Sequence, residues 1–316
     1  MSKRIIALLL SVFALLGVLS GCGERDDKLT VLCTVFPVYD WVRSVVGENE
    51  NIEVKLLVSD GSDLHSFQPT ARDAINIKTA DLVVRVGGAD DSFVNELTKD
   101  TDGIDLRLIE AEGVIQRHVS VSSEHEHSHE GEHDHKHLTD EHIWLSLKNA
   151  RVCVEAICGA LSEIDPSSAE KYRANADAYI EKLIALDYEY AYAVAAVNEP
   201  RLVFADRFPF VYMTEDYGIE YEAAFEGCTT DAEAGFDTVL RLASKVEEWE
   251  LSCLLATESS DQRLPTSVRD AVKGRNIEIA VLDSMQSVTK KDISAGESYI
   301  GIMEKNLAVL REALSK

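Results

Sequence analysis

The segment Pro166–Asn198 reads PSSAEKYRANADAYIEKLIALDYEYAYAVAAVN, with no glycine and no proline after the first residue. Strong helix formers dominate it. Asp165 suits a helix N-cap, Pro166 suits the first helical position, and Pro200 ends the pattern. At 1.5 Å per residue the segment predicts a rod of roughly 50 Å, which can span two lobes. A coiled coil is the alternative, but the apolar face is rich in Ala and Tyr rather than Leu.

Segments typical of strands and helices alternate before this rod. Leu29–Phe36 (LTVLCTVF) is apolar and rich in β-branched residues, as a buried parallel strand should be, and a helix is expected from Pro37 to Val46. The other segments are strands at Ile52–Val58, Asp81–Val86 and Leu106–Ile109, helices at Ala71–Ala80 and Ser92–Lys99, and an amphipathic helix from Leu147 to Leu161. This order predicts a parallel sheet covered by helices on both faces.

The alternation resumes after the rod. Strands are expected at Arg201–Asp206, Tyr221–Phe225, Ser252–Thr257 and Ile277–Asp283, with helices at Phe208–Asp216, Ala232–Trp249, Leu264–Val272 and Ser298–Leu314. The predicted fold class is therefore α/β, with two lobes, each a mainly parallel sheet covered by helices, joined by one long rigid helix. The predicted boundaries are residues 29–165 for the N-terminal lobe, 166–198 for the connecting helix and 199–316 for the C-terminal lobe.

The chain begins MSKRIIALLLSVFALLGVLSGC, in which two cationic residues precede an apolar run and then small residues. This pattern predicts a signal peptide at residues 1–21. The ending Leu19-Ser20-Gly21-Cys22 resembles the bacterial lipobox, so we expect a lipid on Cys22, a tether at 22–28 and a body anchored outside the cytoplasmic membrane. A plain signal peptide with an incidental cysteine is the alternative.

The net charge of −25 excludes most nucleic-acid binding proteins, which need a basic face. It favours a soluble surface with a weak attraction for cations. The cysteines beyond Cys22 match no zinc-finger or redox spacing. Buried free thiols are the simplest expectation, and a Cys228–Cys253 disulfide is the alternative.

Residues Glu124–His137 read EHEHSHEGEHDHKH, within a predicted loop at 118–140. Imidazole is the commonest protein ligand for transition metals, and such a tract indicates metal handling. It has no apolar period and cannot belong to a core. The tract is either the binding site or an accessory to one, and its histidines are His125, His127, His129, His133, His135 and His137.

Potential metal ligands also follow the predicted strands, where open α/β sheets bind their ligands. His65 lies in the loop Asp60–Pro69, and His142 precedes the amphipathic helix. In the second half, Asp206 and Asp283 each end a predicted strand. Each lobe thus presents candidate ligands toward a cleft between the lobes.

Two motifs make a resemblance specific. Asp63-Leu64-His65-Ser66-Phe67-Gln68-Pro69 is similar to an H-x-F-x-P loop, and His142-Ile143-Trp144-Leu145 is similar to an H-x-W-L segment. Together with the lipobox and the long helix, they resemble the zinc and manganese substrate-binding lipoproteins of bacterial ABC importers (cluster 9, or A-I). The acidic His-rich loop resembles the zinc branch. The resemblance spans nearly all of the mature chain.

The resemblance implies a monomeric, non-enzymatic protein that passes a metal ion to an ABC permease driven by a cytoplasmic ATPase. Carried over by residue, it implies that His65 and His142 are metal ligands from the first lobe and Asp283 a ligand from the second. The family's remaining ligand, a His or Glu, falls on Ala205, which cannot bind metal. Asp206, water or a histidine of the tract could complete the shell, and Glu258 is a weaker candidate. Asp206 could instead cap a helix or pair with Arg207.

Two imidazoles, one carboxylate and a fourth position suit tetrahedral zinc, whereas manganese prefers more oxygen ligands. Zinc is therefore the expected ion and manganese the alternative. The same ligands would also suit a zinc hydrolase. However, the H-E-x-x-H spacing occurs only inside the polar His-rich tract, at His125–His129 and His129–His133, which lacks the apolar period of a helix, and G-x-S-x-G does not occur. A surface adhesin or a passive zinc buffer would share these residues too.

Overall fold

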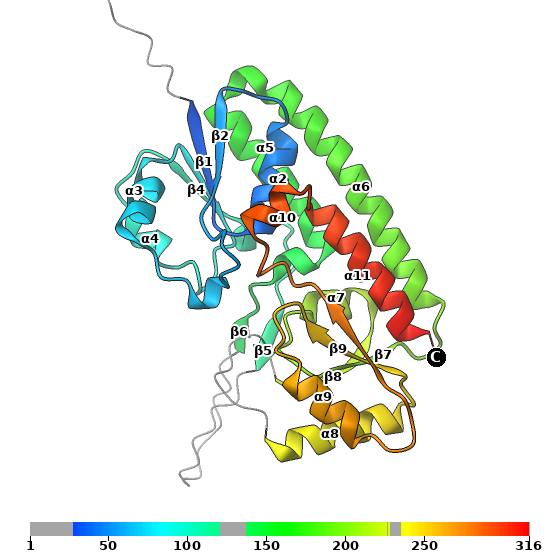
Figure 1. Ribbon diagram of the computed structural model, residues 1–316. Coiled ribbons are helices and arrows are strands. Elements are labelled where there is room, and N and C mark those ends of the chain that lie inside the picture. Colours follow the sequence, from blue (N-terminus) through cyan, green and yellow to red (C-terminus); the bar gives the residue numbers. More distant parts are fainter. Residues whose placement is uncertain (1–27, 121–136, 226, 228–234, 316) are drawn as a thin grey trace, which may run out of the picture.

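The structure, a computed structural model, describes residues 28–120, 137–225, 227 and 235–315 (Figure 1). It contains two lobes, each built on a four-stranded parallel sheet with helices packed on it, so the predicted α/β class is confirmed. The predicted signal peptide, nearly all of the tether and most of the His-rich tract lie outside the described residues. No helix within the described ranges is both long and apolar enough to cross a membrane.

The first sheet has the order β2-β1-β3-β4. Its strands are β1 (Leu29–Cys33), β2 (Ile52–Leu56), β3 (Leu82–Arg85) and β4 (Ile104–Arg107). The helices of this lobe are α2 (Phe36–Val46), α3 (Ala71–Thr79), α4 (Val94–Thr98) and α5 (Leu147–Ile164). All four residues of β3 are buried, as expected for a strand covered on both faces. A short antiparallel hairpin of β5 (His118–Ser120) and β6 (His137–Thr139) was not expected from the sequence.

Strand β4 begins and ends two residues earlier than the apolar run Leu106–Ile109 predicts. Its register with β3 places Asp105 opposite Val83 and Arg107 opposite Arg85. Asp105 can occupy a strand because the buried Arg85 donates two hydrogen bonds to its carboxylate, at 2.7 and 2.8 Å. Leu108–Glu110 instead forms a 3-10 turn. The tertiary ion pair therefore outweighs the local hydrophobic pattern.

The second sheet has the order β10-β9-β7-β8. Its strands are β7 (Arg201–Phe204), β8 (Glu220–Ala223), β9 (Cys253–Thr257) and β10 (Glu278–Leu282). Its helices are α7 (Val211–Tyr217), α8 (Phe236–Glu248), α9 (Arg263–Ala271), α10 (Lys290–Ser294) and α11 (Tyr299–Leu314). In chain order this is the same topology as the first sheet. Each lobe thus has a switch point between its first and third strands, where α/β sheets bind ligands.

The connecting helix α6 spans Ala169–Ala195 and runs along both lobes (Figure 1). Pro166–Ser168 forms a separate 3-10 turn before it, and Asp165 does not cap that turn through its side chain. The helix therefore has 27 residues and is about 40 Å long. It is shorter than the sequence predicts. It packs on α2 and α5 of the first lobe and on α7 and α11 of the second. Its buried residues recur every three or four positions: Tyr172, Ala176, Tyr179, Leu183, Leu186, Tyr190 and Val194.

One hydrophobic core extends across both lobes. At its centre, Trp41 of α2 meets Tyr299 of α11 edge to face, with ring centroids 5.1 Å apart. Tyr190 of α6 donates a 2.7 Å hydrogen bond to the carbonyl of Met303. A second, smaller core lies under α8 and α9 in the second lobe. Because the lobes share packed side chains along α6, large hinge motions would expose apolar surface, and we expect only small closure movements.

Four cysteines lie in the described residues: Cys33, Cys153, Cys158 and Cys253. All are free and buried, in line with the simplest sequence expectation. Burial raises the pKa of the Cys253 thiol to about 11, so it is a poor nucleophile at neutral pH. Cys228 lies outside the described residues.

Asp165 anchors the start of α6 to the first lobe. Its carboxylate accepts hydrogen bonds from Tyr172 (2.7 Å), Ser167 (2.6 Å) and Asn49 (3.2 Å). Burial disfavours the charged form, but the hydrogen bonds from these neighbours outweigh it and hold the pKa of Asp165 well below its usual range. Asp165→Asn should therefore lower the free energy of unfolding by about 2 kcal/mol at pH 7.

The pH dependence follows from the sign of this shift. A depressed pKa in the folded state stabilises the protein above the unfolded pKa of about 3.9, and the stabilisation is lost as pH falls. Urea unfolding should show a smaller difference between wild type and variant at pH 3 than at pH 7. Asp177→Asn is the control, because that exposed side chain on α6 makes only a 3.6 Å surface pair with Arg173. Equal losses in both variants would contradict the anchoring role.

Candidate metal centre

His65 lies in a 3-10 turn, Leu64–Ser66, in the loop after β2. Asp63 caps this turn, because its Oδ1 accepts the backbone N–H of His65 at 3.1 Å. The His65 side chain is 15% exposed and can be reached from solvent. The Asp-x-His spacing thus fixes the backbone of this histidine locally.

His142 is the N-cap residue of a second 3-10 turn, Ile143–Leu145, and its side chain is only 3% exposed. Asp140 accepts the backbone N–H of His142 at 2.8 Å, which repeats the Asp-x-His arrangement. Trp144 packs edge-on against the imidazole with centroids 5.1 Å apart. The Trp144 indole N–H donates to the carbonyl of Ser284, in the second lobe, at 2.9 Å. The second lobe therefore holds Trp144, which in turn packs against His142.

The fold brings the two histidines together, although 76 residues lie between them in the sequence. Their ring centroids lie 5.4 Å apart, with the ring planes at 54°. Two imidazoles bound to one tetrahedral zinc, with Zn–N bonds of about 2 Å, would have centroids roughly 5 Å apart. The observed separation therefore suits a shared ion with little movement of either ring.

Each ring meets a carboxylate through its Nδ1 atom. His142 Nδ1 lies 2.9 Å from Asp140 Oδ1, and His65 Nδ1 contacts Asp90 Oδ2, in the loop after β3. A carboxylate on one ring nitrogen holds the proton there and leaves the other nitrogen to ligate a metal. In His142 this hydrogen bond would leave Nε2 as the metal-binding atom, and the Asp90 contact favours the same assignment in His65.

Glu141 supports the loop that carries Asp90. It accepts the backbone N–H of Asp90 at 3.1 Å and also that of Ala89. Burial, followed by the negative charge of Asp90, raises the pKa of Glu141 to about 7. A Cβ atom at Gly88 would lie 2.2 Å from Glu141 Cδ, so glycine at this position lets the Glu141 side chain come this close to the loop. Several carboxylates thus surround the histidine pair and favour a cation there.

Asp283 follows β10. Within the described residues, its hydrogen bonds are to Met285 and Asn306 of its own lobe. Its Oδ1 accepts the backbone N–H of Met285 at 2.7 Å. Burial and then the charge of Glu258 raise the pKa of Asp283 to about 6. Within the described ranges, no three His, Cys, Asp or Glu side chains are grouped closely enough to enclose an ion. The structure therefore pairs His65 with His142 and does not add Asp283 to them.

Asp206 and Glu258 both have structural partners. Asp206 Oδ2 accepts the N–H and the hydroxyl of Thr257 at 3.2 and 3.0 Å, which joins the ends of β7 and β9 at the switch point. Its Oδ1 accepts the backbone N–H of Arg207 at 2.8 Å, so it neither caps α7 nor pairs with the guanidinium. Glu258 accepts three hydrogen bonds from Ser284 and Ser287. Ala205 is fully buried in the smaller core.

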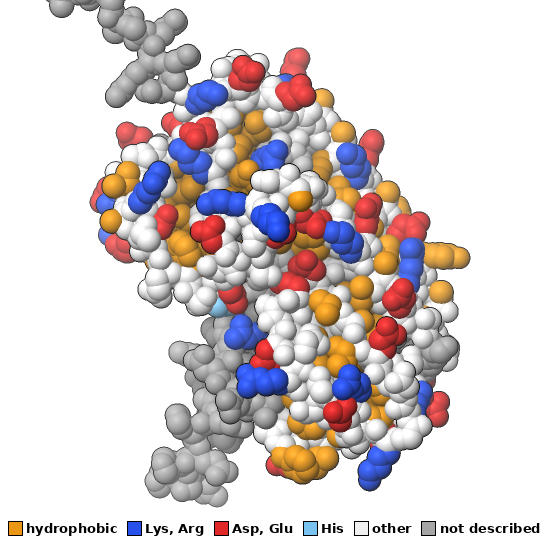
Figure 2. All heavy atoms as spheres, viewed as in Figure 1, with side chains coloured by type: hydrophobic (Ala, Val, Ile, Leu, Met, Phe, Trp, Pro, Cys, Tyr) orange, Lys and Arg blue, Asp and Glu red, His pale blue; other side chains and the backbone are white. Residues whose placement is uncertain are grey.

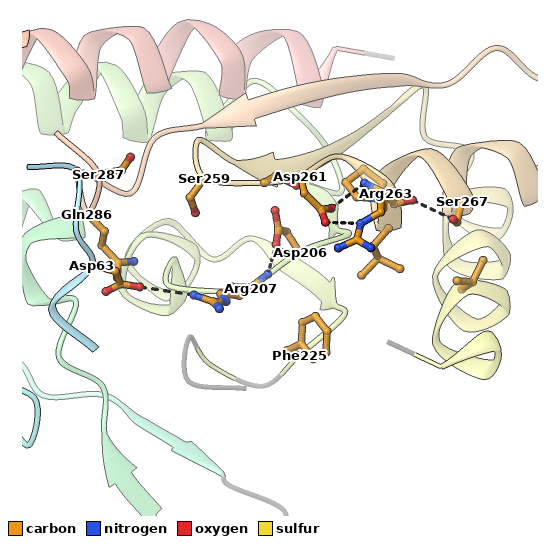
Figure 3. A pocket seen from close by; sticks show the side chains of 15 residues that line it. Asp63, Asp206, Arg207, Phe225, Ser259, Asp261, Arg263, Ser267, Gln286 and Ser287 are labelled. Atoms are coloured by element: carbon orange, nitrogen blue, oxygen red, sulfur yellow. Dashed lines mark hydrogen bonds and ion pairs between the residues drawn. The ribbon is translucent and has the colours of Figure 1, made fainter. Parts of the chain in front are cut away.

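A cavity of about 600 Å³ lies between the lobes at the switch point of the second sheet (Figure 3). Its lining includes Gly61 and Asp63 from the first lobe, and Asp206, Arg207, Ser259 and Gln286 from the second. Arg207 Nη1 reaches across it to Asp63 Oδ2, at 3.5 Å (Figure 3). Asp63 thus lies between this cavity and His65. In the space-filling view, histidine shows where the two lobes meet (Figure 2).

Sequence reasoning missed the residues around the histidine pair. Asp63 and Asp140 could have been found from the repeated Asp-x-His spacing, which is typical of a side chain that caps a turn. Asp90 and Arg207 come from distant loops and carry no comparable sequence signal. The tract histidines from His125 to His135 lie outside the described residues, and for His137 only the backbone, in β6, is described.

Comparison with known proteins adds the family. The model of a family described as "Zinc-uptake complex component A periplasmic" (ZnuA) matches residues 31–313. This chain belongs to the ZnuA family. The zinc-binding lipoprotein AdcA of Streptococcus pneumoniae is 33% identical over 311 residues, which are 98% of this chain and 61% of that protein. The chain thus spans less than two thirds of the AdcA relatives that it matches.

Two further matches cover most or all of the compared chain. The high-affinity zinc uptake system protein ZnuA of Bacillus subtilis is 27% identical, with 93% of this chain and 90% of that protein covered. The crystal structure of the Zn(II)-bound ZnuA-like domain of S. pneumoniae AdcA superposes with a TM-score of 0.71 at 27% identity. That match covers 92% of this chain and all of the domain. The resemblance expected from the two histidine motifs is confirmed.

Proposed function

We propose that this protein captures zinc outside the cytoplasmic membrane and delivers it to an ABC permease for import. The observation that carries the proposal is the histidine pair, with centroids 5.4 Å apart and each Nδ1 on a carboxylate. Two oriented imidazoles at the junction of two lobes suit reversible capture of one divalent ion. A cytoplasmic ATPase would drive the transfer, and no covalent chemistry is needed.

The proposed ligands are His65, His142 and Asp283. Asp283 would have to turn from its own loop toward the histidines, with a small closure of the lobes. Zinc is favoured over manganese because two of the three proposed ligands are imidazoles, whereas manganese prefers oxygen ligands. Asp206 is a weaker candidate, since both of its oxygens already accept hydrogen bonds. The tract histidines would act as accessory ligands that raise the local concentration of zinc.

The proposed location follows from the start of the chain and from the relatives. Residues 1–21 would be removed, Cys22 would carry the lipid and 22–28 would tether a monomeric body to the membrane. The name "zinc-binding lipoprotein" of the S. pneumoniae relative supports this arrangement. The hydrolase alternative is not favoured. It would need a general base beside the zinc-bound water, and the carboxylates of Glu258 and Asp206 in the second lobe are engaged by Ser284 and Thr257.

Deletion of residues 124–137 distinguishes zinc binding in the cleft from zinc binding by the His-rich tract. We expect the purified mature protein without the tract to bind fewer zinc ions in total but to keep one tight site. Metal analysis after dialysis gives the stoichiometry, and competition with a chelator gives the affinity. Replacing the tract with a Gly/Ser segment of equal length is the matched control for loop length. Loss of all tight binding in both variants would contradict a site at the histidine pair.

Import itself is tested in cells. A strain that lacks the protein should grow poorly when zinc is limiting, and added zinc should restore growth. Added manganese should not. Normal growth of that strain under zinc limitation would contradict an import role and favour a passive buffer or an adhesin.

A further inference from the structure

The carboxylate of Asp63 lies beside the atom of His65 that would bind metal. Asp63 Oδ1 is 3.9 Å from His65 Nε2, while Asp90 occupies the Nδ1 side of the same ring. The second oxygen, Oδ2, is 3.5 Å from Arg207 Nη1 of the opposite lobe. The Asp63 side chain is 25% exposed, so solvent and ions can reach it. One oxygen therefore faces the metal-binding nitrogen and the other faces a cation across the cavity.

The distance can be compared with that of two ligands on one ion. With Zn–N and Zn–O bonds of about 2.0–2.2 Å, two donor atoms of a tetrahedral shell lie roughly 3.4 Å apart. The distance from Asp63 Oδ1 to His65 Nε2 exceeds this value by about half an ångström, which a small rotation of the carboxylate can remove. Oδ1 already accepts the backbone N–H of His65, and a carboxylate oxygen has a second lone pair for a metal.

We propose that Asp63 is itself a zinc ligand, binding through Oδ1 beside His65 and His142. This inference rests on the proposed function and adds an oxygen donor from the first lobe. It would place three donors on one lobe once the Asp63 carboxylate turns toward the ion, because as they stand no three His, Cys, Asp or Glu side chains of the described residues are grouped closely enough to enclose one. Asp206, across the cavity, is held by Thr257, so it does not compete for this position.

The charge count agrees with this assignment. Neutral His65 and His142 with the single carboxylate of Asp63 would leave a net charge of +1 on a bound Zn²⁺. Asp283 arriving from the second lobe would neutralise it. The attraction between the bound ion and Asp283 would therefore stabilise the closed state, and this attraction becomes stronger as water leaves the cleft.

Asp63→Ser tests the ligand role while keeping the turn. Serine is as good a cap as aspartate, so the N–H of His65 keeps an acceptor, but its hydroxyl is too short and uncharged to replace the carboxylate on the ion. We expect zinc affinity to fall at least tenfold in a chelator competition assay, since loss of an outer-shell partner alone costs about 10–100-fold. A crystal structure of the zinc-loaded wild type should place Asp63 Oδ1 about 2.0–2.2 Å from the ion.

Asp261→Ser is the matched control. Asp261 also caps a turn two residues on, accepting the N–H of Arg263 at 2.9 Å, and it pairs with that arginine at the far side of the cavity. The zinc affinity of the Asp261→Ser variant should equal that of wild type. His65→Ala separates the two proposals. If wild type binds no zinc, or if His65→Ala keeps full affinity, the proposed function fails. If His65→Ala loses binding but Asp63→Ser does not, or if Oδ1 lies more than about 3 Å from the bound ion, the Asp63 assignment fails.

Discussion

His142→Ala should abolish tight zinc binding, and His65→Ala should do the same. Each change removes a nitrogen donor outright, so the loss in affinity should exceed the 10–100-fold typical of outer-shell changes. His142 is nearly fully buried, with its Nδ1 on Asp140 and Trp144 packed against the ring. Competition titration against a zinc chelator, with the tract deleted from every variant, measures the effect on the cleft alone.

His118→Ala is the control for this pair. His118 lies on the exposed hairpin strand β5, where its Nδ1 lies 3.4 Å from the hydroxyl of Thr139. Its loss should leave zinc affinity unchanged. The double variant His65→Ala/His142→Ala should be little worse than either single variant, because one missing imidazole already breaks the shell. Wild-type affinity in either single variant would refute the histidine pair as the binding site.

Arg85→Leu should cost about 3–5 kcal/mol of folding stability, the largest effect we expect from any change outside the metal centre. Arg85 is fully buried in β3. Its guanidinium donates to Asp105 at 2.7 and 2.8 Å, to Asp91 at 3.0 Å and to Asn95 at 2.5 Å. Without it, the buried Asp91 would lose its positive partner and keep only the N–H of Gly87. Urea unfolding at neutral pH measures the loss.

Arg107→Leu is the matched control on the neighbouring strand. Arg107 also pairs with Asp105, at 3.5 Å, and with Glu110 at 3.2 Å, but its side chain is 37% exposed. Exposed pairs contribute about 0–1 kcal/mol, so this variant should unfold close to wild type. A similar loss in both arginine variants would show that burial of the network is not what stabilises the first lobe.

The Arg85 network also links stability to the metal centre. Asp91 accepts the N–H of Gly87 and thereby holds the loop in which Asp90 meets His65. A variant that loosens this loop should weaken zinc binding as well as folding. The effect on affinity should be smaller than that of His65→Ala, because the imidazole itself remains.

Local sequence was sufficient to predict most of the helices and strands and to select both histidines as candidate ligands. Period-two and period-3.6 patterns depend on neighbours only a few residues away, so α6 and the buried strands could be predicted. The boundaries that failed did so for non-local reasons. β4 shifted because Arg85 of the adjacent strand neutralises Asp105. The start of α6 moved because the Asp165 carboxylate binds Asn49 and Tyr172 instead of capping the helix.

The amino-acid sequence by itself determined the two α/β halves, the long helix between them and two turns that each present a histidine after an aspartate. Tertiary structure alone decided that the histidines lie 5.4 Å apart, that Asp90 orients one of them, and that Arg207 reaches Asp63 from the other lobe. The physical reason is the distance along the chain over which each kind of interaction acts. Capping and periodicity act within one turn of chain, whereas the convergence of loops depends on a core shared by both lobes, which no short stretch encodes.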